Sequence, residues 1–342
     1  MTTPIDWDAA TDEAATLLRD YVRIDTSNPP GNEALAVDWL AALFTREGIP
    51  YETAGSAPGR AYGVGWLAEH RPNWLDTELV INEGAYGITG LAGAAQIFYI
   101  SPTEKVPLWV RLRATGRPGH GSVPHAENCA DRIVAALDRV AKWEQPLQMT
   151  PVMRAQLDGL IAAKVLRAHD TKELADLARK TPSLRARLGN TVALTTITTG
   201  IKVNVIPAEA TATLDCRLMP DADVDRFLAD LARVVADDKV SLEVLNRSKG
   251  GETSMDHEFV RAVDDAVHEL AEGARVLPEL SSGFTDSRIY RLRGVPAFGF
   301  IPCLVETADL GGIHGHNERI SIENLRLGMQ ILHSVVMRLC AA

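Results

Sequence analysis

Residues 106–124 read VPLWVRLRATGRPGHGSVP. In the first half of this stretch apolar residues occupy every second position, which is the pattern of a strand with one buried face. The second half is a loop rich in glycine, proline and serine, and the apolar stripe that follows it predicts a helix. The alternating residues are Val106, Leu108, Val110, Leu112 and Ala114, and the stripe consists of Cys129, Ile133, Leu137 and Val140.

The elements that follow complete one domain. We expect a helical insertion at 147–189, strands at 192–198 and 210–218, a helix at 227–235 and a strand at 240–245. The order strand-helix-strand-strand-helix-strand is that of a ferredoxin-like domain. We therefore assign residues 105–246 to an inserted α+β domain and expect it to fold on its own.

The flanking segments, 1–104 and 247–342, alternate helix with strand. The first predicts helices at 8–23 and 36–44, a short strand near Tyr51, and a buried strand at 79–81 that ends at Asn82-Glu83-Gly84. The second predicts a helix at 258–271, a strand at 296–301 and a terminal helix capped by Ser321. The predicted fold class is α/β: a discontinuous α/β domain interrupted by the inserted domain.

Composition narrows the function. The chain has 342 residues, 46% of them hydrophobic and 23% charged, with a formal net charge of −10. An acidic protein repels phosphate, so we expect no nucleic-acid partner. No apolar run is long enough to span a membrane, and the N-terminal residues lack the features of a secretion signal. The four cysteines lie far apart, which favours reduced thiols in the cytoplasm.

The loop at 116–124 places His120 between two glycines. Such a loop can hold an imidazole exposed on the surface, where the imidazole can polarise an oxyanion. The alternative is a plain strand-to-helix turn with an incidental histidine. A second glycine-flanked histidine, His314, precedes the terminal helix. It can donate a ring nitrogen to Zn²⁺, oriented by Glu318 or Asn317, although the same residues also suit a solvated helix entry.

Three further residues are candidates for a site. Arg288, in the segment TDSR at 285–288, offers a guanidinium that can clamp a carboxylate, or it belongs to a surface turn. Glu83 follows a buried strand, where ligand sites of α/β sheets lie, or it merely terminates the strand. Asn204, in NVIP at 204–207, is either structural or a partner for a substrate carboxylate.

Together these segments resemble the landmarks of the M20 peptidase family. The resemblance rests on NEG at 82–84, GRPGHGS at 116–122, NVIP at 204–207, TDSR at 285–288, HGHNERI at 314–320 and YVRIDTSNPPGNE at 21–33. It implies a dinuclear zinc domain that carries an inserted lid domain, through which the protein forms a homodimer. Members hydrolyse amide or peptide bonds near a free carboxylate, as in N-acyl amino acids and small peptides.

The resemblance also implies roles for individual residues. Glu83 matches a ligand of one zinc ion and His314 a ligand of the other. His120 matches the lid histidine that reaches the active site of the partner subunit. Asn204 and Arg288 match groups that position the substrate.

The chain departs from the family pattern at the metal centre. The family has an HxD motif, a bridging aspartate in a DxKG-like motif, and a Glu-Glu pair. None of the nine histidines is followed two positions later by aspartate, and neither the DxKG-like motif nor a Glu-Glu pair occurs. The resemblance passes directly from Arg60-Ala61 to the segment 62–70, which implies that roughly a hundred residues with the central strands are missing after about residue 61.

This departure yields two function hypotheses. The first is an M20-type metal-dependent hydrolase scaffold with impaired catalysis, because no base stands beside a metal to activate water. The alternative is a non-catalytic remnant that only dimerises or binds carboxylates. The loss of central strands also predicts partly uncovered apolar faces around Ile81, Phe298 and Leu332.

Overall fold

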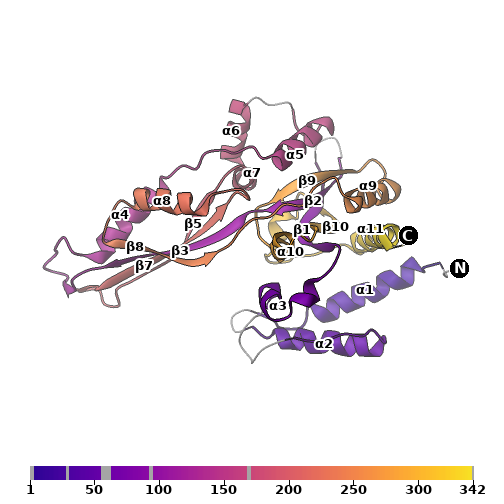
Figure 1. Ribbon diagram of the computed structural model, residues 1–342, viewed down its shortest axis with the longest axis horizontal. Coiled ribbons are helices and arrows are strands. Elements are labelled where there is room, and N and C mark those ends of the chain that lie inside the picture. Colours follow the sequence, from indigo (N-terminus) through magenta and orange to yellow (C-terminus); the bar gives the residue numbers. More distant parts are fainter. Residues whose placement is uncertain (1–3, 28–30, 55–62, 92–94, 168–170, 341–342) are drawn as a thin grey trace.

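The computed structural model describes residues 4–27, 31–54, 63–91, 95–167 and 171–340. Figure 1 shows two sheets joined by a long strand crossing, with N-terminal helices on one side and a helical segment on the other. The crossing runs from β2 (Ile97–Glu104) into β3 (Val106–Thr115), and Lys105 is the residue between them. This arrangement of parallel and antiparallel sheets with helices confirms the predicted α/β fold class.

The first sheet has the order β1-β10-β2-β9. Its other strands are β1 (Val80–Thr89), β9 (Arg275–Ser281) and β10 (Ala297–Glu306). β1 runs parallel to β10 and β2 parallel to β9, whereas β10 and β2 are antiparallel. The helices α9 (Glu258–Leu270) and α11 (Ile322–Cys340) pack on one face around Phe98, Phe298 and Ile331.

The second sheet is antiparallel, with the order β5-β7-β3-β8. Its other strands are β5 (Thr191–Thr199), β7 (Glu209–Leu218) and β8 (Val240–Arg247), and α4 (Cys129–Ala141) and α8 (Val224–Val235) contribute to its core. A short ladder pairs β4 (Gly119–His120) with β6 (Val205–Ile206). The alternating residues of 106–114 are buried as predicted, because the helices cover that face.

The helical segment consists of α5 (Pro151–Ala162), α6 (Thr171–Lys180) and α7 (Pro182–Arg187). Successive residues of β2 point to opposite faces of its sheet. Phe98 and Ile100 therefore join the core under α9 and α11, while Ile97 and Tyr99 pack near Leu160 of α5. A helix from within 105–246 thus covers the second face of the first sheet. The assignment of 105–246 to a domain of its own remains a prediction.

The N-terminal helices leave several apolar side chains exposed to solvent. They comprise α1 (Trp7–Tyr21), α2 (Glu33–Arg46), α3 (Val64–His70) and the short 3-10 helix η1 (Pro72–Leu75). α1 packs on α11, where the rings of Trp7 and His333 lie 5.6 Å apart. Leu18 and Leu35 remain exposed at 38% and 52%. Within the described residues, no helix has both the length and the apolar character that a membrane span requires.

Several expectations need correction. Residues 49–54 contain no strand, so the predicted strand near Tyr51 is wrong. β1 does not end at Asn82-Glu83-Gly84 but continues to Thr89, because an irregular register lets it keep pairing with β10. Phe298 is fully buried, since α9 and α11 cover it, whereas Leu332 is 38% exposed. The predicted junction at residues 60–62 lies outside the described residues.

Candidate functional site

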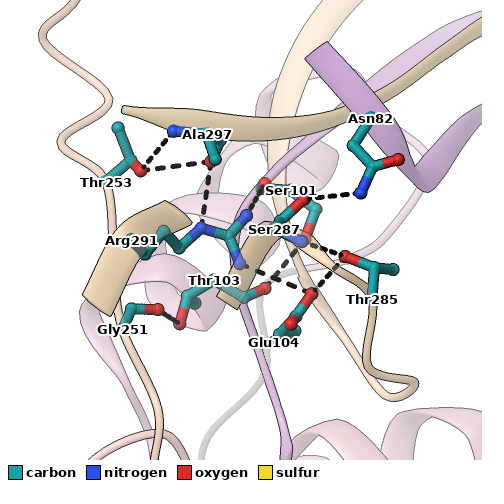
Figure 2. Close-up of polar contacts among 10 residues, drawn as sticks. All are labelled: Asn82, Ser101, Thr103, Glu104, Gly251, Thr253, Thr285, Ser287, Arg291 and Ala297. Carbon is teal, nitrogen blue, oxygen red and sulfur yellow. Dashed lines mark hydrogen bonds and ion pairs between the residues drawn. The ribbon is translucent and has the colours of Figure 1, made fainter. Parts of the chain in front are cut away.

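A buried polar cluster lies where β2 leaves the first sheet (Figure 2). Arg291 and Glu104 form an ion pair of 3.4 Å, and their side chains are 1% and 2% exposed. Arg291 also donates to the backbone carbonyls of Ala297 and Ser101, at 2.9 and 3.0 Å. The hydroxyl of Thr285 donates to Glu104 at 2.9 Å. These contacts fix the loop at 285–286 and the helix α10 (Ser287–Leu292) against the first sheet.

Burial dominates the electrostatics of this pair. It raises the pKa of Glu104, while the neighbouring charge of Arg291 and the hydrogen bonds of Thr285 oppose that rise. Burial likewise lowers the pKa of Arg291, against the pull of Glu104. An ion pair this deep contributes to geometry more dependably than to stability, because desolvation offsets its attraction. We infer that the ion pair serves to hold α10 in place against the first sheet.

Arg288 lies in the first turn of α10. Its Nη1 donates to the hydroxyl of Ser248 at 3.3 Å, and its guanidinium lies 5.7 Å from the ring centroid of Phe284. Its Nε is buried without a hydrogen-bond partner. The charge of Arg288 acts on the buried Glu104, whose pKa it helps to lower, but Glu104 is paired with Arg291. Arg217 lies over the same ring at 4.7 Å but is neutralised by Asp215 at 2.7 Å. Arg288 is therefore a positioned cation with an unmet Nε donor and without a carboxylate of its own.

Glu83 lies within β1 rather than after it and is exposed. Its neighbour Asn82 donates to the hydroxyl of Ser287 at 3.2 Å, which ties β1 to the start of α10. The backbones of β1 and β10 approach closely here, since a side chain at Gly299 would come 2.8 Å from the carbonyl oxygen of Glu83. Glu83 and Arg288 are thus attached to adjoining parts of the same framework.

His314 lies in an open, polar pocket of about 990 Å³. Asp25 and Glu318 line the same pocket; of the two residues expected to orient His314, Glu318 and Asn317, Glu318 is in the lining. Hydrogen bonds from Ser27 lower the pKa of Asp25, which keeps this carboxylate ionised. Our sequence reasoning missed Asp25. The signal was an Asp-x-Ser turn pattern directly after a helix.

His120 lies on the ladder of β4 and β6, where it pairs with Val205, and Asn204 directly precedes β6. The backbone N–H of Gly121 donates to the carbonyl of Asn204 at 2.8 Å, and the side chains of both His120 and Asn204 are exposed. The backbone N–H of Ser122 donates to Nδ1 of His120 at 3.2 Å. Nδ1 also lies 2.7 Å from the hydroxyl of Ser122, so Ser122 holds this edge of the ring and leaves Nε2 as the nitrogen that can meet a substrate oxygen.

The implied zinc ions do not fit this set of residues. In the described ranges, no group of three or more histidine, cysteine, aspartate or glutamate side chains is arranged to hold a metal ion. His314 shares its pocket with two carboxylates, but the pocket is open and these groups are not gathered around a common point.

Comparison with known proteins places this arrangement in context. The family described as "Peptidase family M20/M25/M40" matches residues 49–338. "N-fatty-acyl-amino acid synthase/hydrolase PM20D1" of Mus musculus is 29% identical over 264 residues, covering 72% of this chain and 52% of that protein. "Aminoacylase-1" of Homo sapiens is 28% identical over 241 residues, covering 68% and 50%. The chain spans about half the length of the curated relatives it matches.

Solved structures agree on the fold. The dipeptidase Dug1p from Saccharomyces cerevisiae has a TM-score of 0.56 at 13% identity, covering 82% of this chain and 63% of that one. The M20 family metallo-carboxypeptidase Sso-CP2 from Sulfolobus solfataricus has a TM-score of 0.53 at 17% identity, covering 79% and 65%. At this identity the likeness concerns architecture alone.

Proposed function

This chain belongs to peptidase family M20/M25/M40, and from that premise we propose that it is a hydrolase scaffold whose parent activity is cleavage of an amide or peptide bond near a free carboxylate. Two kinds of relative support this substrate class by their names, an N-fatty-acyl-amino acid synthase/hydrolase and an aminoacylase. N-acyl amino acids and small peptides share the required chemistry, an amide next to a carboxylate.

The state of Arg288 carries the proposal. A guanidinium that rests on an aromatic ring and bonds a hydroxyl is held in one orientation, so it loses little freedom when it binds. Its missing anion is supplied by a substrate carboxylate, which a guanidinium binds through two parallel hydrogen bonds. Asn204 and His120, exposed on the inserted domain, are the proposed partners for the rest of the substrate.

We also propose that catalysis is impaired in the chain of 342 residues. Family hydrolysis depends on bound metal, and the described residues offer no cluster of ligands for it. The second candidate is a binding protein without turnover, and the unmet Nε donor of Arg288 supports this candidate equally. The missing cluster of metal ligands and the unmet donor of Arg288 together favour binding without hydrolysis.

A homodimer through the inserted domain is part of the proposal. β5 and β8 are the two edge strands of its sheet, and they expose Ile197 at 53% and Val244 at 41%. An exposed, partly apolar strand edge favours pairing with another edge. A cytoplasmic location is proposed as well, since Cys129 and Cys216 are buried as free thiols.

The decisive experiment compares an N-acyl amino acid with the same compound capped as its C-terminal amide. Calorimetry should show binding of the free acid and little binding of the capped compound. With zinc added, release of amino acid should stay at background. Equal binding of the two compounds contradicts the role of Arg288, whereas zinc-dependent turnover supports the parent activity and contradicts the impairment.

A further inference from the structure

A second pocket, of about 720 Å³, lies in the inserted domain. It opens between the end of α4, the loop that follows α4, α6, α7 and the start of β5. Its volume is in the range of small-molecule sites. It shares no lining residue with the pocket of His314 or with the surroundings of Arg288.

One wall of this pocket is apolar. Leu137 and Val140 come from the buried stripe of α4, and Val192 and Leu194 from the start of β5. Trp143 adds an aromatic surface, and its ring is held by Phe227 at a centroid distance of 5.2 Å. Leu194 is 46% exposed. A ligand with a hydrocarbon chain would bury that chain against these apolar side chains.

Two further lining residues carry buried donors that lack acceptors. Nη1 of Arg185 and Nε2 of Gln145 are both buried without a hydrogen-bond partner, and both residues line the pocket. The two are joined, because Nη2 of Arg185 donates to the backbone carbonyl of Gln145 at 2.5 Å. A buried donor without an acceptor is costly, so two of them beside one cavity indicate a missing acceptor group.

The local charge indicates that this acceptor is an anion. Glu144 also lines the pocket, but no carboxylate of the described residues forms an ion pair with Arg185, whereas Arg179, at the same pocket, is paired with Asp176. Lys105 lies close enough that the charge of Arg185 adds to the burial that lowers the pKa of Lys105 to about 7. Lys105 already donates to the carbonyls of Ala186 and Gly189. The unmet positive charge is therefore that of Arg185.

Glycine at position 189 permits this arrangement. A Cβ there would lie 2.7 Å from Nη1 of Arg185 and 2.7 Å from the carbonyl oxygen of Pro146. Only a residue without a side chain lets the guanidinium lie against the backbone beside the loop that carries Gln145. The position of Arg185 is thus built into the chain.

From this geometry we propose that the pocket binds a medium-chain carboxylic acid. Its carboxylate accepts from Arg185 and Gln145, and its hydrocarbon chain lies along Trp143, Val192 and Leu194. The inference does not depend on the proposed hydrolase or on Arg288. It assigns the inserted domain a ligand of its own.

Calorimetry with sodium decanoate, against decanol as a neutral probe of equal length, tests the inference on the full chain. We expect saturable binding of one decanoate per chain and about tenfold weaker binding of decanol, since a hydrogen-bonded charge discriminates by that order. Equal affinity for the two probes, or no saturable binding of decanoate, overturns the proposal. Absence of saturable decanoate binding would mean that no carboxylate accepts from Arg185 and Gln145.

Two matched variants locate the binding. Leu194→Glu places a negative charge at the wall and should weaken decanoate about tenfold, whereas the neutral Leu194→Gln should leave most of the affinity. Light scattering checks that both variants have the same oligomeric state. Arg185→Met should also lose binding, and the Leu194 pair decides the matter if that variant does not fold. Arg226→Met, an exposed change away from the pocket lining, should bind decanoate like wild type. Equal losses in both Leu194 variants refute the assignment.

Discussion

Arg291 of α10 and Glu104 at the end of β2 form an ion pair that is almost completely buried, with side chains 1% and 2% exposed. The pair joins the strand that crosses between the two sheets to the helix that carries Arg288. Arg291 therefore fixes the position of Arg288, although Arg291 itself touches no proposed ligand.

We expect Arg291→Met to lower the free energy of unfolding by about 3–5 kcal/mol, because it leaves a buried carboxylate without its partner. The double variant Glu104→Leu with Arg291→Met should lose less than the sum of the single variants, since no charge then remains buried. Urea unfolding followed by circular dichroism measures both. Additive losses would show that the two side chains do not act as a pair.

Lys105 predicts a dependence of stability on pH. Burial, followed by the charges of Arg185 and Arg217, lowers its pKa from 10.5 to about 7, while Asp215 acts in the opposite direction. Between these values the unfolded chain keeps a proton that the folded chain has released, so stability rises with pH across this window. Relative to Lys105→Met, wild type should gain stability from pH 7 towards 10.5. Urea unfolding at stepped pH tests this, and a constant difference contradicts it.

Arg288 should dominate binding of a carboxylate ligand. Arg288→Met should weaken an N-acyl amino acid by roughly ten- to a hundredfold, which corresponds to the loss of charged hydrogen bonds. Arg288→Lys should lie between, because an ammonium keeps the charge but not the paired geometry. The exposed Arg226 on α8 supplies the control Arg226→Met, for which calorimetry should show no change. A similar loss in the control would point to a general electrostatic effect.

The metal content of the chain should be low. Glu83 and His314 are the two donors that the family resemblance assigns, whereas a zinc site usually needs about three to four. We expect at most one weakly held zinc ion and no hydrolysis of N-acyl amino acids. Equilibrium dialysis with elemental analysis counts the metal. Two tightly bound ions with measurable turnover would refute both expectations.

Self-association should follow an edge of the inserted sheet. A lysine at Ile197 on β5 or at Val244 on β8 should shift the dimer towards monomer, depending on which edge pairs. Ile201 and Val203 are fully exposed outside the strands, so Ile201→Lys is the control for Ile197 and Val203→Lys the control for Val244. Size exclusion with light scattering separates dimer, monomer and aggregate. A wild-type monomer at micromolar concentration would dismiss the dimer.

Local patterns determined a large share of the fold. The alternation at 106–114 predicted β3, and the stripe through Cys129 and Ile133 predicted α4, because each periodicity follows from the geometry of one element. Ser321 was expected to cap the last helix, and its hydroxyl accepts from the backbone of Asn324 at 3.1 Å. The motifs around Glu83, His120 and His314 indicated the family for the same reason, since each is contiguous in the chain.

Tertiary structure alone decided which of these residues meet. Thr285 and Glu104 are 181 positions apart, and nothing local indicates that one donates to the other. The continuation of β1 to Thr89 depends on β10, and the burial of Phe298 depends on α9 and α11. The unmet donors of Arg185 and Gln145 likewise arise only when α7 packs beside the loop after α4. Pairing and burial are properties of the packed chain, because they depend on partners that periodicity within one element cannot specify.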